Sequence, residues 1–270
     1  MIESYIFDLY GTLADIRTDE SMPSLWRRMA LLLSMQGAEY RAGELQQAYR
    51  AAVQHEIERC ANQRPDILLE HVEPDILPVF QALYEQKGIS VNTAEIKDTA
   101  LFFRTLSMVR PVRLYPHVMF VLHALRGRGK GVYLLSNAQA AFTVPELTRL
   151  GLLNCFDGIV LSSNAGVKKP DKAIFEHMLS KYQLRPETCM MIGNDMDADM
   201  GGAAAVGMIG RYIHTNLSPE TQGPLPPNCQ QITGLLSSLP VRRNEPAVEY
   251  GGEPPPILPA VGPLAGPHEP

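Results

Sequence analysis

A regular alternation of strand-like and helix-like segments in the second half of the chain constrains the fold most. Short apolar runs rich in strand formers are separated by longer segments with apolar residues at helical spacing. The predicted strands are 131–137, 157–163, 188–195 and 207–213, and the predicted helices lie near 117–127, 140–150, 171–182 and 198–206. This alternation predicts an α/β fold, with a Rossmann-like parallel sheet covered by helices on both faces.

The N-terminal segment adds a strand to this sheet. "YIFDLY" is a short apolar run that ends at Gly11, so it predicts a buried strand followed by a tight turn. In parallel sheets of this kind, ligands bind outside the carboxyl ends of the strands. Because Asp8, Ser136 and Asp195 all fall at such ends, the topology predicts that they converge.

The chain between the first strand and the alternating half has a different pattern. Residues 17–110 contain no convincing strand and read as an all-helical insert, with helices over "SMPSLWRRMALLLSMQG" and near 42–61, 74–87 and 92–109. The apolar stripe expected on the first helix comprises Leu25, Met29, Leu32 and Met35. We therefore expect an α/β core formed by 1–16 and 111–216, with a helical cap at 17–110.

Residues 217–270 are expected to form a proline-rich tail. From position 218 onward the chain holds 13 of its 22 prolines, a density that predicts extended, disordered chain. The alternative is a polyproline II ligand for the groove of a protein partner.

Composition limits the other partners. The net charge of −5, the isoelectric point of about 5.8 and the absence of a long basic run argue against nucleic acid and anionic membranes. No window approaches the roughly 18 to 20 apolar residues of a membrane span, and the N-terminus reads as a strand instead of a signal peptide. We therefore expect a cytoplasmic protein that acts on a small molecule. The four dispersed cysteines are expected to be free thiols, since close Cys/His spacing for zinc is missing.

Two motifs place polar groups directly after predicted strands. Asp8 precedes a glycine turn, and its carboxylate could be a nucleophile, a metal ligand or a helix cap. Ser136 and Asn137, in "LLSNAQ", could bind an anionic group or simply cap the next helix.

Two further motifs carry charge. Lys169, before Pro170, could neutralise a carboxylate or phosphate at the sheet edge, or could be an ordinary surface lysine. In "MMIGNDMDADMGGA", Asp195, Asp197 and Asp199 crowd the end of a strand. Clustered carboxylates repel one another unless a cation is present, and such oxygen ligands suit Mg²⁺. The alternative is an acidic helix N-terminus favoured by the helix dipole.

In order and spacing, "FDLYGTL", "LLSNA", "KKPDKAIF" and "IGNDMDAD" resemble the four motifs of the haloacid dehalogenase-like (HAD) hydrolase superfamily, over about residues 1–215. The helical segment 17–110 is similar to the family's cap, inserted after the first motif. The resemblance implies that Asp8 is the nucleophile, forming an aspartyl ester or aspartyl phosphate that water hydrolyses. It implies that Thr12, Ser136 and Asn137 bind the transferred group, with the charge of Lys169 beside it.

The same resemblance implies a Mg²⁺ site. Its ligands would be Asp8, the backbone carbonyl of Tyr10 and an acidic residue of the fourth motif. Family members often have Asp where this chain has Asn194, so Asp195 is the expected ligand and Asp199 the second acidic position. Asp197 is expected to be solvated.

Tyr10 departs from the phosphatase pattern. Phosphatases of the superfamily usually have Asp at this position as a general acid–base, a role worth roughly 10²–10⁴-fold in rate. A phenol with an ordinary pKa of about 10 replaces it poorly, whereas dehalogenases have Tyr because a halide leaves without a proton. Tyr10 therefore favours substrates with good leaving groups: haloacids, acyl phosphates or activated phosphate esters.

The aspartate cluster decides between these alternatives, because charge neutralisation by Mg²⁺ suits phosphoryl transfer. We predict a Mg²⁺-dependent phosphatase acting on a small phosphorylated metabolite. The alternatives are a metal-independent 2-haloacid dehalogenase-like hydrolase and a non-catalytic sensor or scaffold of the same fold. A dehalogenase would need a cap arginine for the halide, and the surroundings of Arg27, Arg28 and Arg41 do not match that pattern.

Cap residues are expected to select the substrate. Trp26, His55 and His71 are candidates, although a structural or solvated position is the expectation for each.

Overall fold

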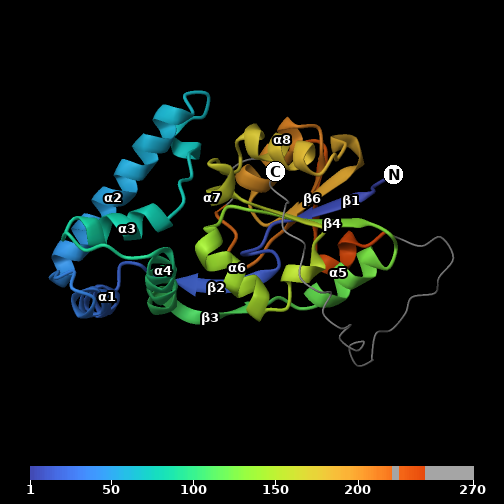
Figure 1. Cartoon of the computed structure of the whole chain (residues 1–270). Coiled ribbons are helices and arrows are strands. Elements are labelled where there is room, and N and C mark those ends of the chain that lie inside the picture. Colours follow the sequence, from blue (N-terminus) through green and yellow to red (C-terminus); the bar gives the residue numbers. More distant parts are fainter. Residues whose placement is uncertain (221–224, 241–270) are drawn as a thin grey trace, which may run out of the picture. The chain divides into compact units, whose positions relative to one another are not determined.

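The computed structural model describes residues 1–220 and 225–240, which include a six-stranded parallel sheet (Figure 1). Its strands, in chain order, are β1 (Ser4–Phe7), β4 (Gly131–Ser136), β5 (Gly158–Leu161), β6 (Cys189–Gly193), β7 (Ile209–Ile213) and β8 (Cys229–Ile232). The strand order across the sheet is β5-β4-β1-β6-β7-β8. β1 pairs in parallel with β4 on one side and with β6 on the other. β4 and β5 therefore extend the sheet in one direction from β1, and β6, β7 and β8 extend it in the other.

Alternate side chains of each strand enter two separate cores. On β1, Tyr5 and Phe7 join one apolar cluster, and Ile6 joins the other. The first cluster is completed by α5 (Val118–Arg126) and α6 (Ala140–Arg149), and the second by α8 (Lys172–Lys181) and α9 (Gly202–Ala205). Burial on both faces explains the continuous apolar runs, because a parallel sheet has no solvated face. The predicted α/β, Rossmann-like core is confirmed.

Short helices fill the remaining connections of the core. They are η2 (Leu153–Cys155), α7 (Ser162–Ala165), η3 (Pro186–Thr188), the π-helix η4 (Met196–Gly201) and η5 (Leu235–Ser238). All four cysteines of the chain are free.

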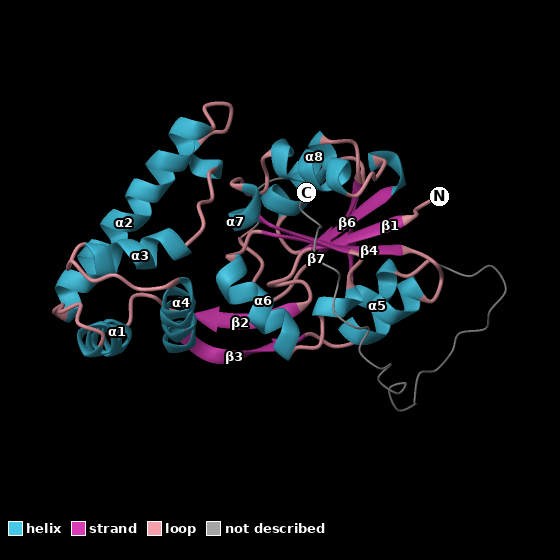
Figure 2. Ribbon diagram, viewed as in Figure 1, coloured by secondary structure: helices cyan, strands magenta, loops and turns pink. Residues whose placement is uncertain are grey.

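The segment between β1 and β4 holds four longer helices with a core of their own. They are α1 (Pro23–Met35), α2 (Ala42–Gln63), α3 (Leu77–Glu85) and α4 (Thr93–Ser107), with the turn η1 (Leu69–His71) between α2 and α3 (Figure 2). Four aromatic rings pack at the centre of this cluster with centroids 5.1 to 5.9 Å apart: Trp26, Tyr49, Phe80 and Phe103. We call α1 to α4 the cap helices.

The apolar stripe predicted for α1 is wrong at its end. Leu25 and Met29 are buried, but Met35 is 79% exposed. The buried face instead runs through Trp26 and Leu33. The predicted positions are four, three and three residues apart, which averages less than the 3.6 residues of a helical turn, so the stripe drifts off the face that meets the neighbouring helix.

Strands border the cap helices and overlap both ends of 17–110, the segment predicted to contain no strand. β2 (Ala14–Thr18) and β3 (Met108–Leu114) pair antiparallel, one before α1 and one after α4 (Figure 2). All residues of β3 are exposed or half-buried, and the strand contains Pro111. Such an edge ribbon buries too little apolar surface to produce an alternating pattern, and proline argues against a strand.

The prediction of a disordered tail from 217 onward is wrong for its first part. β8 pairs with β7 at the sheet edge, and Cys229 and Leu235 are buried in the core clusters. The prolines of this stretch flank β8 and leave its own residues free to pair. The proline-rich residues 241–270, with the polyproline II prediction, lie outside the described residues. In the described part of the chain, no helix combines the length and apolarity needed to cross a bilayer.

Candidate active site

The carboxyl ends of three neighbouring strands meet at one cavity of about 160 Å³. Asp8 follows β1, Ser136 ends β4, and Asp195 follows β6. These strands are adjacent in the sheet, which brings the three side chains to the edge where ligands of α/β sheets bind. Every residue that the four motifs predict for the site lines this cavity, with the exception of Thr12.

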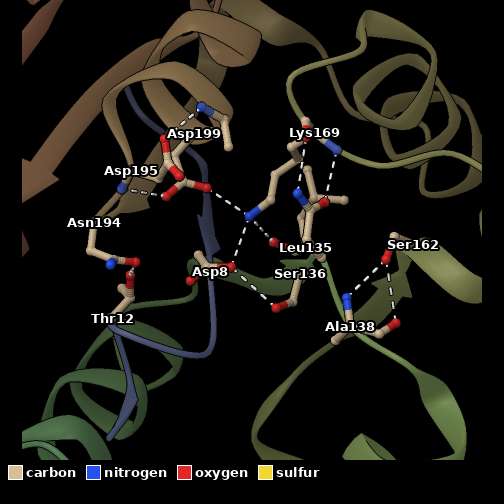
Figure 3. Close-up of polar contacts among 12 residues, drawn as sticks. Asp8, Thr12, Leu135, Ser136, Ala138, Ser162, Lys169, Asn194, Asp195 and Asp199 are labelled. Atoms are coloured by element: carbon tan, nitrogen blue, oxygen red, sulfur yellow. Dashed lines mark hydrogen bonds and ion pairs between the residues drawn. The ribbon is translucent and has the colours of Figure 1, made fainter. Parts of the chain in front are cut away.

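Lys169 lies at the centre of the site (Figure 3). Its Nζ donates to Asp8 Oδ1 at 2.8 Å, to Asp199 Oδ1 at 2.6 Å and to the carbonyl of Leu135 at 2.9 Å. Burial lowers the pKa of this ammonium, but Asp199 and Asp8 raise it by more, so the net pKa lies above the ordinary value. All three protons of the ammonium are used, and the lysine ties Asp8 to the fourth motif.

Asp199 is held from two sides. Its Oδ1 accepts from Lys169, and its Oδ2 accepts from the backbone N–H of Asp195 at 3.0 Å. Burial raises the pKa of Asp199 to about 7, against the attraction of Lys169 and with a contribution from the charge of Asp8. A Cβ at Gly193 would overlap the Asp199 carboxylate, so only glycine allows this close approach at the end of β6.

Asp195 starts the π-helix η4 and stays partly accessible. Its Oδ1 accepts from the backbone N–H groups of Asp197 at 2.9 Å and Ala198 at 2.8 Å, while the residue lines the cavity. Asp197 is exposed. The π-helix carries Asp199 back toward Lys169, in keeping with the frequent occurrence of π-turns at functional sites.

Two predicted ligands of the transferred group form hydrogen bonds to neighbouring residues of the site. Thr12 is fully buried outside the cavity wall, and its hydroxyl donates to Asn194 Oδ1 at 3.1 Å. The Asn137 side chain donates to the carbonyl of Lys169 at 2.9 Å and accepts from its N–H at 2.8 Å. Ser136 is closer to the prediction, since its hydroxyl lines the cavity and donates to Asp8 Oδ1 at 3.1 Å.

The turn after Asp8 has a conformation suited to glycine. Gly11 has a φ of +89°, and a Cβ there would overlap the amide of Asn194. The predicted tight turn therefore also serves as the contact between the first and fourth motifs. Asn194 fills the space above Gly11 and accepts from Thr12, which fixes the two loops against each other.

The donor set fits a divalent cation. Asp8 and Asp199 pair with the ammonium of Lys169, and Asp195 lines the same cavity, so the carboxyl groups of the cavity outnumber its one cationic side chain among the described residues. Mg²⁺ is bound through one or two carboxylates plus waters and substrate oxygens, without a closed protein cage. Among the described residues, no group of three His, Cys, Asp or Glu side chains is arranged to hold a metal ion by itself, so a cation here would need waters or substrate oxygens as further ligands.

The phenol of Tyr10 is engaged by residues that the sequence reasoning missed. Its hydroxyl donates to the carboxylate of Glu146 and lies 3.1 Å from Thr143 Oγ1, both on α6. Arg104, from cap helix α4, donates to Glu146 Oε1 at 2.7 Å and lies over the Tyr10 ring, 5.6 Å from its centroid. Burial, followed by the charge of Glu146, raises the pKa of Tyr10 well above the ordinary value. The phenol therefore stays protonated, with its proton directed at Glu146.

A sequence signal for this network existed but was weak. Arg104 stands in "LFFRTLS" and Glu146 in "VPELTR", each a single charge on the apolar side of a helix. A charge in such a position is costly unless it is paired, but the sequence does not identify the partner.

The cap residues considered from sequence do not line the cavity. Trp26 belongs to the cap core, and the side chain of His55 is exposed. His71 Nδ1 lies 3.0 Å from Asp171 Oδ2, at the start of α8. The three arginines considered for a halide site are all exposed: Arg27, Arg28 and Arg41.

Comparison with known proteins identifies the family. Residues 2–207 match the haloacid dehalogenase-like hydrolase family. The chain belongs to this family of hydrolases. The predicted family membership is thereby confirmed.

Curated relatives match over part of their length. The chain is 29% identical to the glyceraldehyde 3-phosphate phosphatase of Methanothermobacter thermautotrophicus over 122 residues, covering 45% of this chain and 54% of that protein. It is 29% identical to the phosphoserine phosphatase of Thermus thermophilus over 140 residues, covering 52% of this chain and 54% of that protein. These matches span about half the length of the relatives.

The chain shares its fold with solved structures of a phosphatase and of a dehalogenase. A HAD phosphatase from Thermococcus onnurineus superposes with a TM-score of 0.53 at 16% identity, covering 88% of this chain and 96% of that one. An L-2-haloacid dehalogenase superposes with a TM-score of 0.52 at 20% identity, covering 88% and 97%. At these identities the likeness shows the fold alone, and the reaction must be argued from the site.

Proposed function

We propose that the chain is a Mg²⁺-dependent phosphatase that acts on a small phosphorylated metabolite through an aspartyl phosphate at Asp8. The observation that carries the proposal is the cavity at the carboxyl edge of the sheet, which is lined by Asp8, Asp195 and Asp199, the first and last of them paired with Lys169. Such a surplus of carboxyl groups is suited to a divalent cation and a phosphoryl group together. The phosphatase names of the curated relatives support the same reaction.

Asp8 is the nucleophile in this proposal. One of its carboxylate oxygens attacks phosphorus, the bond from phosphorus to the leaving oxygen breaks, and the electron pair departs with that oxygen. Water then attacks phosphorus, the bond to Asp8 breaks, and both protons of the water end on the released phosphate. The roles of Ser136 and Lys169 are to orient Asp8, since both donate to its Oδ1.

Mg²⁺ would be held by Asp8, the backbone carbonyl of Tyr10 and Asp195. Bound there, it would neutralise charge that develops on the phosphoryl oxygens. We place Asp199 outside the direct ligands, because its two oxygens already accept from Lys169 and the Asp195 N–H. Asp199 would instead hold the lysine in place, which revises its predicted role as a ligand.

The leaving group is proposed to depart without a proton. The proton of Tyr10 is directed at Glu146, and Arg104 keeps that carboxylate paired. A phenol with a raised pKa is a weak general acid. Acyl phosphates meet this limitation, because their carboxylate leaving group is stable as an anion.

The test is phosphate release from acetyl phosphate and p-nitrophenyl phosphate, with and without Mg²⁺, with Asp8→Asn as the blank. We expect Mg²⁺-dependent release that disappears in EDTA and in Asp8→Asn, and that is faster with acetyl phosphate. Release that survives both EDTA and Asp8→Asn would exclude this mechanism.

A metal-independent haloacid hydrolase is the second candidate, and Tyr10 is the observation that favours it. In that reaction Asp8 would displace halide from carbon, and the ester formed would be hydrolysed. Chloride release from a 2-chloro acid in the presence of EDTA would establish it. The absence of chloride across a panel of 2-halo acids would remove it.

A further inference from the structure

The cavity has an apolar wall that comes from outside the family match. Leu217 and Pro219, in the segment after β7, line the same cavity as Asp8. The family match ends at residue 207, so this wall belongs to the part of the chain that its relatives in the family need not share. The rest of the lining is almost entirely polar.

Hydrogen bonds fix this segment against the catalytic loop. Thr215 Oγ1 donates to the carbonyl of Gly11 at 2.7 Å, three residues after the nucleophile. Asn216 donates to Asp15 Oδ1 at 3.0 Å and accepts from the Tyr115 hydroxyl at 2.7 Å. The wall is therefore a built part of the site, positioned by both the loop after β1 and the β2–β3 ribbon.

The turn itself is closed by one side-chain and one backbone hydrogen bond. Thr215 and Ser218 exchange hydrogen bonds, with the Thr215 N–H donating to Ser218 Oγ at 3.0 Å and the Ser218 N–H donating to the carbonyl of Thr215 at 3.1 Å. Leu217, between them, is half-buried, and Pro219 after the turn is exposed. A closed turn holds the leucine in one place, which is what a specificity contact requires.

The cavity offers no charge for a second anionic group. Among the described residues that line it, Lys169 is the single cationic side chain, and all three of its donors are already used. The buried arginine of the cap, Arg104, is paired with Glu146. A carboxylate or second phosphate packed against this wall would find no cationic partner in the lining, and any hydration that it lost there would be uncompensated.

We propose that the substrate carries a single anionic group, the phosphoryl group, on a short uncharged remainder that packs against Leu217 and Pro219. This inference rests on the proposed phosphatase function and names its substrate class: acyl phosphates whose acyl group is short and uncharged. The small cavity volume agrees, since pockets for drug-sized ligands measure roughly 300–1,000 Å³. Substrates with an extra carboxylate, such as the phosphoserine in the name of one relative, are disfavoured by the same argument.

The experiment compares two acyl phosphates of the same chain length, butyryl phosphate and succinyl phosphate, which differ in a terminal methyl against a terminal carboxylate. The unaltered chain with Mg²⁺ is expected to prefer butyryl phosphate in kcat/KM by on the order of tenfold or more, because the carboxylate is desolvated without a partner. Leu217→Lys should reduce that preference by a similar factor. Leu217→Ala should lower kcat/KM for butyryl phosphate about fivefold through lost apolar contact and leave succinyl phosphate little changed.

The matched control is Leu69→Lys, which adds the same charge at an exposed leucine of η1 outside the cavity lining. It should leave the preference unchanged, which separates local recognition from general attraction of anions. Circular dichroism checks the fold of each variant, and Leu217→Ala keeps the test valid if Leu217→Lys does not fold.

Each outcome bears on a different claim. Equal kcat/KM for the two substrates in the unaltered chain would overturn the single-anion inference and leave the phosphatase function standing. A preference unaffected by both Leu217 variants would overturn the role of the wall. No turnover of either substrate would overturn the proposed function and this inference together.

Discussion

Replacing Arg104 by methionine should destabilise the chain strongly, because it leaves a buried carboxylate without its cation. The side chains of Arg104 and Glu146 are only 15% and 7% exposed, and they lie 2.7 Å apart. Methionine keeps much of the length and apolar contact of the arginine while removing its charge. Breaking a buried pair from one side costs about 3–5 kcal/mol, a large fraction of the roughly 5–15 kcal/mol by which folded proteins are stable.

The assay is urea unfolding of Arg104→Met beside a matched surface variant, Lys87→Met. Lys87 forms an ion pair of 2.6 Å with Glu44, but the two side chains are 29% and 50% exposed. An exposed pair contributes roughly 0–1 kcal/mol, so the free energy of unfolding of Lys87→Met should stay within that range of the unaltered chain. The contrast isolates burial as the cause, since the two pairs have similar lengths.

A double variant tests whether the cost comes from the unpaired carboxylate. Arg104→Met with Glu146→Leu removes both charges, and it should recover most of the stability lost in Arg104→Met. A loss below 1 kcal/mol in Arg104→Met would contradict the reasoning. So would a double variant that is no more stable than the single one, because the carboxylate would then not be the source of the penalty.

Three further changes have expected outcomes. Gly11→Ala should cost more than the roughly 1–2 kcal/mol of a left-handed residue and should reduce turnover, because the new Cβ would also overlap a neighbouring side chain. Gly129→Ala, also at positive φ but in open space, should cost only that amount. Equal losses of stability in thermal melts would contradict the overlap. Leu235→Ala should lower the free energy of unfolding in urea by about 2–5 kcal/mol, because this side chain after β8 is buried. The same change at the exposed Leu236 should alter it by no more than about 0.5 kcal/mol. Similar values for the two variants would argue against this packing. A hydrogen bond from Asn216, followed by the hydrogen bond and charge of Arg113, holds the pKa of Asp15 below its usual value against the effect of burial. The stability that Asp15 contributes is therefore present above a pH of about 3.9 and is lost as pH falls through the folded pKa. Asp15→Asn should make stability depend less on pH in that window, and an unchanged acid-unfolding profile would refute the reasoning.

The part of the site that followed from sequence is the part set by strand ends. Asp8, Ser136 and Asp195 were placed by the rule that polar residues after buried parallel strands meet at one edge. That rule needs only local apolar runs, which are strong where a strand is buried on both faces. The contact of Lys169 with Asp8 follows from the same topology, because its loop lies next to the end of β4.

The remainder depended on tertiary contacts that leave little local pattern. Thr12 and Asn137 have the same side-chain chemistry as ligands, and only the fold shows that they bond to Asn194 and to the Lys169 backbone. The pairing of Arg104 with Glu146 joins residues 42 positions apart. Their relation is invisible without the helix packing.

Strands with little buried surface were not predicted from the sequence, for a related reason. The exposed ribbon β2–β3 has no continuous apolar run, and β8 is a short edge strand between prolines. In both cases pairing with an existing neighbour, and not the strand's own pattern, determines the structure.

The most direct test of the central claim is to identify the atom that is covalently modified during turnover. The chain is mixed with acetyl phosphate and Mg²⁺, quenched in acid within the first turnover, and digested for peptide mass spectrometry. The account predicts a phosphoryl group on the peptide of Asp8, absent in EDTA and in Asp8→Asn. The contradicting result is an unmodified Asp8 peptide during active turnover, or the incorporation of ¹⁸O from labelled water into the Asp8 carboxylate with a 2-chloro acid, which would assign the site to carbon–halogen hydrolysis.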